Sequence, residues 1–68
     1  MRPVKTFVAD KHTPSDEEIQ EAIIYANTKD CVVLLYWVNI DNYLDHITIH
    51  PGNTFEEAKN AIPTIVAL

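Results

Sequence analysis

The chain has 68 residues, of which 47% are hydrophobic and 22% are charged, so one small globular domain spanning residues 1–68 is expected. Ten acidic residues oppose five basic ones, and the formal charge of −5 has the wrong sign for neutralising nucleic-acid phosphates. Cys31 is the only cysteine, which excludes an intrachain disulfide and favours a reducing compartment. The longest apolar run, residues 32–38, is too short to span a bilayer, so no membrane partner is expected. Together with the acidic charge and the single cysteine, this predicts a cytoplasmic protein with no nucleic-acid partner.

The first half of the chain predicts a strand followed by a helix. Apolar and polar residues alternate over residues 4–8, as in a short strand. Residues 13–16 read Thr-Pro-Ser-Asp, which predicts a helix capped by Thr13 with a proline in its first turn. The helix is expected to end near Asn27, and its apolar stripe consists of Ile19, Ala22, Ile23 and Ala26.

The second half predicts a β-hairpin and a second helix. Residues 32–38 are all apolar or aromatic and many are β-branched, which favours a strand. Residues 39–42 supply turn chemistry, and residues 43–50 alternate, with isoleucines on one face and histidines and Thr48 on the other. Thr54 and Glu57 fit a capping box, after which Pro63 ends the helix and begins an apolar tail, residues 63–68.

The expected fold is therefore α+β, in β-α-β-β-α order, with an antiparallel hairpin sheet and both helices packed on one face. The strand 32–38 does not alternate between polar and apolar residues, so both of its faces need cover. Two short helices cover one face only, which leaves the other apolar face for the tail or for an interaction partner. Two alternative sets of side chains compete for this exposed face: Val33, Leu35 and Trp37, or Val32, Leu34, Tyr36 and Val38.

Catalytic, metal and cofactor sites are not expected. His46 and His50 share a strand face but lie roughly 13 Å apart at about 3.3 Å per residue, too far for one ion. Ser15 is expected in the first turn of a helix, and the acidic pairs have helix-capping explanations. With Gly52 as the only glycine, there is no phosphate-binding glycine-rich loop. We therefore expect a protein that is not an enzyme and needs no cofactor.

Residues 52–58, Gly-Asn-Thr-Phe-Glu-Glu-Ala, resemble the strand-to-helix junction of HicB-type antitoxins, which are small acidic α/β proteins that bind a toxin. The similar segment covers about a tenth of the chain. It implies an antitoxin-like, toxin-binding role as one alternative function.

The main prediction is a small acidic binding protein, an inhibitor or regulator of the phage or mobile-element type, that occludes a protein partner through an apolar sheet face. Self-association into a homodimer or larger oligomer is expected on the same grounds. The alternative from another class is a homo-oligomer that binds or sequesters a small, nucleotide-like ligand. Trp and Tyr are enriched at binding hot spots. The predicted partner-binding residues are Leu35, Tyr36, Trp37, Tyr43, His46, Thr48 and His50.

Overall fold

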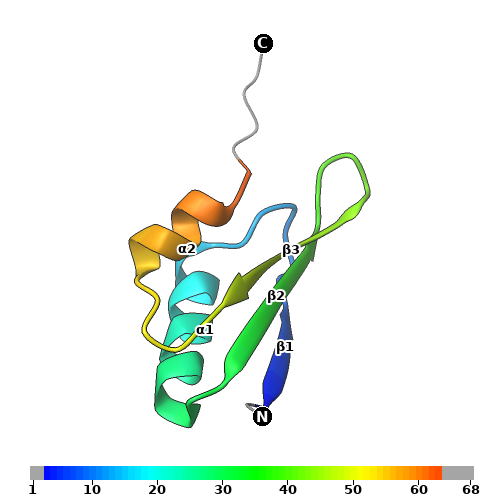
Figure 1. The fold of residues 1–68 in the computed structure, drawn as a ribbon. Helices are drawn as coiled ribbons and strands as arrows, with labels where there is room; N and C mark the ends of the chain where they lie inside the picture. The colour runs from blue at the N-terminus through cyan, green and yellow to red at the C-terminus, as the bar shows by residue number, and fades with distance from the viewer. Residues whose placement is uncertain (1–2, 64–68) are drawn as a thin grey trace.

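Residues 3–63 are described by a computed structural model, which contains two helices and a three-stranded sheet (Figure 1). This confirms the predicted small α+β class. Residues 64–68 of the predicted apolar tail lie outside the described residues. In chain order the elements are β1 (Val4–Val8), α1 (Asp16–Lys29), β2 (Val32–Val38), β3 (Leu44–Ile49) and α2 (Phe55–Ala61).

The sheet is mixed, with strand order β1-β2-β3. β2 and β3 pair antiparallel, with Leu35 opposite Ile47, whereas β1 pairs parallel to β2, with Thr6 opposite Leu34. The expectation of an antiparallel sheet is therefore wrong for β1. The reason is that β1 and β2 are joined through α1, and a helical crossover is the connection that parallel strands require.

A capping box fixes the start of α1 at Ser15 and not at the predicted Thr13. The Ser15 hydroxyl accepts a hydrogen bond from the Glu18 backbone N–H at 3.2 Å, and the Glu18 carboxylate accepts one from the Ser15 N–H at 2.9 Å. Pro14 thus precedes the cap, where it is buried, and does not form the first turn. The predicted Thr54 cap of α2 is confirmed, with the same reciprocal bonds to Glu57.

Asn27 links the end of α1 to the loop before α2. Its side-chain amide donates to the Ile23 carbonyl at 3.0 Å, and its amide oxygen accepts from the Gly52 N–H at 2.7 Å. The helix continues past Asn27 to Lys29 and ends at Asp30, which takes the left-handed conformation at φ 50°. The prediction of an end near Asn27 is therefore two residues short, because Asp30 and not Asn27 supplies the left-handed cap.

The core lies between the helices and one face of the sheet. Figure 1 shows α1 and α2 on the same side of the sheet, and no element of residues 3–63 covers the other side. The phenyl ring of Phe7 on β1 meets the ring of Tyr25 on α1 edge-on, with centroids 5.3 Å apart. The buried residues of the hydrophobic core cluster are Ala9, Ile19, Ala22, Ile23, Ala26, Cys31, Val33, Leu35, Trp37, Ile47, Ile49 and Ala58.

Candidate functional site

Strand alternation separates the two faces of β2. Val33, Leu35 and Trp37 point toward the helices and are at most 2% exposed. The intervening residues of β2 are half-buried or exposed, and so point away from the helices. We call the side of the sheet without helices the open face. It consists of Val4, Thr6 and Val8 on β1, Val32, Leu34, Tyr36 and Val38 on β2, and Leu44, His46 and Thr48 on β3.

The strand register arranges the open face in cross-strand rows. The central row is Thr6, Leu34 and Thr48, so one leucine of the middle strand lies between two threonines of the edge strands. In the next row the rings of Tyr36 and His46 stack at a tilt of 30°, with centroids 5.1 Å apart. This pair is the largest aromatic feature of the open face, and aromatic side chains are the commonest anchors of protein interfaces.

Apolar side chains at the strand ends of the open face are exposed to solvent. Val4 is 60% exposed, Val8 is 70% exposed and Leu44 is 65% exposed. Val38, at the end of β2, is 42% exposed. Exposed apolar side chains gathered on one sheet face are typical of surfaces that proteins use for interaction.

Two predicted site residues are misplaced. Leu35 and Trp37 are 1% and 2% exposed and belong to the core, so neither side chain is available to a partner at the open face. The physical reason is the period of two along a strand: Tyr36 cannot share a face with its neighbours Leu35 and Trp37. Of the two alternative sets on β2, the exposed one is therefore Val32, Leu34, Tyr36 and Val38.

The other predicted site residues lie on or beside the open face. Tyr36, His46 and Thr48 are part of it. His50 directly follows β3 and is exposed, and Tyr43 is 72% exposed in the loop between β2 and β3. Their role in binding stays a prediction.

Sequence reasoning missed the contribution of β1 and of Leu44 to this surface. The alternation of residues 4–8 predicts the strand and its two faces, but it does not show which strand lies beside it. The parallel pairing of β1 with β2 adds Val4, Thr6 and Val8 to the open face. The strand–helix–strand order was the signal that could have predicted this pairing.

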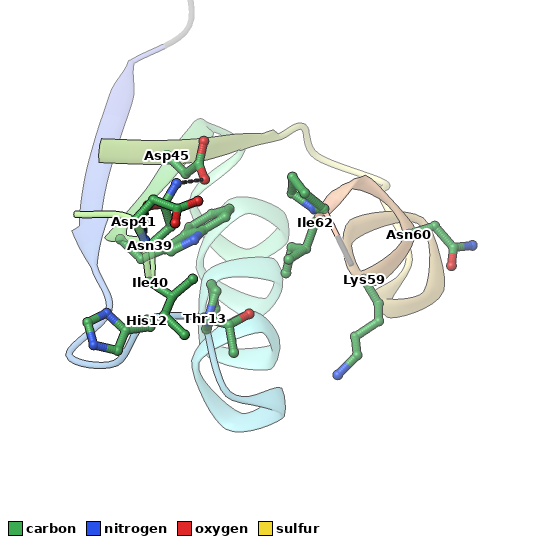
Figure 2. A pocket seen from close by; sticks show the side chains of 12 residues that line it. His12, Thr13, Asn39, Ile40, Asp41, Asp45, Lys59, Asn60 and Ile62 are labelled. Carbon is green, nitrogen blue, oxygen red and sulfur yellow. Dashed lines mark hydrogen bonds between the residues drawn. The ribbon is translucent and has the colours of Figure 1, made fainter. Parts of the chain in front are cut away.

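A second surface feature is a cleft of about 540 Å³ between the β2–β3 loop and the end of α2. Figure 2 shows Ile40 of the loop and Ile62 at the end of α2 on opposite sides of this space, while Asn60 points away from it. The indole of Trp37 forms part of the lining.

Hydrogen bonds hold the loop wall of the cleft in place. The Asn39 side-chain amide donates to the Asp45 carboxylate at 2.8 Å, as the dashed line in Figure 2 marks. The Asn39 amide oxygen accepts from the backbone N–H groups of Asp41 and Tyr43, both at 3.0 Å. The ring nitrogen Nδ1 of His12 lies 3.0 Å from the Val38 carbonyl oxygen, so it donates to that carbonyl and ties the first loop to the end of β2.

Within residues 3–63, no group of three or more His, Cys, Asp or Glu side chains is arranged to hold a metal ion. Neither α1 nor α2, the helices of this described range, has the length and apolar character needed to cross a membrane. Comparison of the chain with protein-family models, with curated proteins and with solved structures finds no match.

Proposed function

We propose that this chain is a non-enzymatic binding protein that docks on a partner through its open face. The observation that supports this proposal is the apolar surface of the open face, which no element of residues 3–63 covers. Covering such a surface removes apolar area from water, which gains about 25 cal/mol of binding free energy per Å². The gain is available only to a partner that presents a complementary apolar surface.

The proposed mode of action is steric occlusion by a regulator or inhibitor. Tyr36, stacked on His46, supplies the aromatic anchor, and Leu34 lies in the central row. The threonine hydroxyls of the same row supply polar contacts without placing a charge in the interface. A partner whose functional surface docks here is blocked by the sheet itself, with no chemical step.

A matched pair of lysine variants tests the proposal. Thr48→Lys places a charged side chain on the open face, whereas Thr28→Lys makes the same chemical change at an exposed position near the end of α1. Both variants change the net charge equally, so a difference between them reports on the position of the charge. We expect proteins retained from a lysate of the source cells by the natural chain to be retained by Thr28→Lys and lost by Thr48→Lys. Equal retention by both variants would exclude the open face as the binding surface.

The cleft supports a second candidate function, the binding of a small ligand. Trp37 lines the cleft, and its indole N–H makes no hydrogen bond to another residue in the range 3–63, so it can donate to a ligand acceptor. Asp41, Asp45 and Lys59 also line the cleft, so both carboxylates and an ammonium group are available to the polar groups of a nucleoside-like ligand. Trp37 is the only tryptophan, so its fluorescence reports on binding directly. No fluorescence change with a panel of nucleosides and nucleobases would exclude this function.

The antitoxin-like role stays a prediction from residues 52–58. It has its own test, because deletion of an antitoxin makes the neighbouring toxin gene lethal. Unchanged growth after deletion would exclude it.

A further inference from the structure

The charged residues of the described chain all lie off the open face. The exposed positions of the helix layer carry the acidic residues of α1 and α2, and the loops carry Asp10, Lys11 and Asp41. Two charged residues belong to strands, Lys5 on β1 and Asp45 on β3, and both occupy positions that alternate toward the helices. The open face thus carries no Asp, Glu, Lys or Arg in a chain whose formal charge is −5.

This distribution decides which partner chemistry fits the open face. A basic partner surface is attracted to the carboxylates, but these lie on the helix layer, in the loops and, for Asp45, on the helix-facing side of β3. A cation docked on the open face would lose its hydration without meeting an anion, which is costly. The open face therefore fits a surface that is apolar, uncharged and similar in size. The chain itself carries such a surface.

We propose that a second copy of the chain covers the open face, so that the protein forms a homodimer by packing sheet against sheet. This inference rests on the proposed function, because it names the occupant of the same docking surface. Two packed sheets lie about 10 Å apart with their strands at about 30°, and their side chains interdigitate. A two-fold axis near the central row brings Leu34 of each copy close to its equivalent. The acidic helix layers then lie on the two outer sides, separated by both sheets.

The size of the open face sets the strength of the dimer. Three strands spaced about 4.8 Å apart, each about six residues long at about 3.3 Å per residue, give a flat footprint of roughly 300 Å². Stable interfaces bury about 800 Å² of accessible surface on each partner. The side chains that project from the sheet make the accessible area of the open face larger than this flat footprint, but it stays below that value. We therefore expect a weak dimer that exchanges with monomer. A third protein that binds the open face must compete with it.

Salt dependence distinguishes self-association from attraction to a basic partner. Two chains of charge −5 repel each other at long range, and salt screens this repulsion because the Debye length falls from about 30 Å at 0.01 M to about 3 Å at 1 M. Sedimentation equilibrium of the purified chain across a wide concentration range should show a monomer–dimer equilibrium that shifts toward dimer as sodium chloride increases. A mass that stays monomeric at millimolar concentration overturns the proposal, and so does a dimer that dissociates as salt is added.

Variants locate the interface. Thr48→Lys should lower the dimer association constant at least tenfold, whereas Thr28→Lys should leave it within about twofold, with both variants checked for folding by circular dichroism. Leu34→Lys and Leu34→Glu should each be monomeric alone, and their mixture should form a heterodimer because the opposite charges meet near the axis. No heterodimer from folded variants, or a dimer insensitive to Thr48→Lys, overturns sheet-to-sheet packing.

The two proposals fail in different ways. A purified chain that stays monomeric, together with a lysate partner lost by Thr48→Lys, overturns the dimer and leaves the docking function in place. A dimer that forms equally in both threonine variants, together with a lysate partner retained by both, overturns the open face as a docking surface and the dimer proposal with it.

Discussion

Leu34 and Leu35 are neighbours on β2 and lie on opposite faces of the sheet, so alanine substitutions at the two positions compare the burial of the two faces. Leu35 is 1% exposed and packs in the core, whereas Leu34 is half-buried on the open face. Replacing a buried leucine with alanine costs about 2–5 kcal/mol, because apolar contacts are lost and a cavity remains. At about 0.05–0.15 kcal/mol per residue, a chain of 68 residues has a free energy of unfolding of roughly 3–10 kcal/mol. Leu35→Ala therefore removes a large share of the total stability.

Leu34→Ala is expected to cost the folded monomer only about 1 kcal/mol, since part of this side chain already contacts water. Urea unfolding followed by circular dichroism and by the fluorescence of Trp37 measures both costs in the same chain. If the open face is covered by a second copy, the cost of Leu34→Ala should increase with protein concentration, and the cost of Leu35→Ala should increase less. Equal costs for the two variants at low concentration would refute the assignment of Leu34 to an uncovered face.

Three further predictions concern the elements that position the sheet. Ser15→Ala removes the cap of α1 and should lower the free energy of unfolding by about 1 kcal/mol, as measured by urea denaturation, with an unchanged midpoint contradicting the cap. The Ser15 backbone N–H donates to Glu18 and holds the pKa of that carboxyl below its ordinary value of 4.5, so its stabilisation is present above about pH 4.5 and is lost as pH falls through the lower folded pKa. Glu18→Gln should therefore flatten the acid decline in stability below pH 4.5, and Glu17→Gln, which alters no capping bond, is the control. Asn27→Ala removes the acceptor for the Gly52 N–H and should raise the hydrogen-exchange rate of that amide, and an unchanged rate would contradict the link.

The elements of this fold were largely predictable because their signals are local. The capping box of Thr54 and Glu57 needs only residues that are three positions apart, and the apolar run 32–38 is a strand by composition. The cap of α1 was misassigned because Thr13 and Ser15 both suit the role, and the choice depends on which one has a glutamate three residues later. Glu18 stands at that distance from Ser15.

The candidate site was less predictable because it depends on pairing between strands. An apolar run has no polar face, so the sequence of β2 alone does not show whether Leu34 or Leu35 is buried. Pairing with β3 supplies the missing information, since Ile47 lies opposite Leu35 and Thr48 lies opposite Leu34. The alternation of β3 was visible in the sequence, but the register that transfers it to β2 is set by the loop at residues 39–43.

The edges of the sheet offer another route to self-association, and local features oppose it. β1 and β3 are the outer strands, and each pairs on one side only within residues 3–63. Edge strands that avoid pairing are short and carry proline or lysine. β1 has five residues, follows Pro3 and contains Lys5, while β3 has six residues and is followed closely by Pro51. No such feature protects the open face, because none of its residues is Asp, Glu, Lys, Arg or Pro. Association is therefore expected across the face of the sheet before it is expected along its edges.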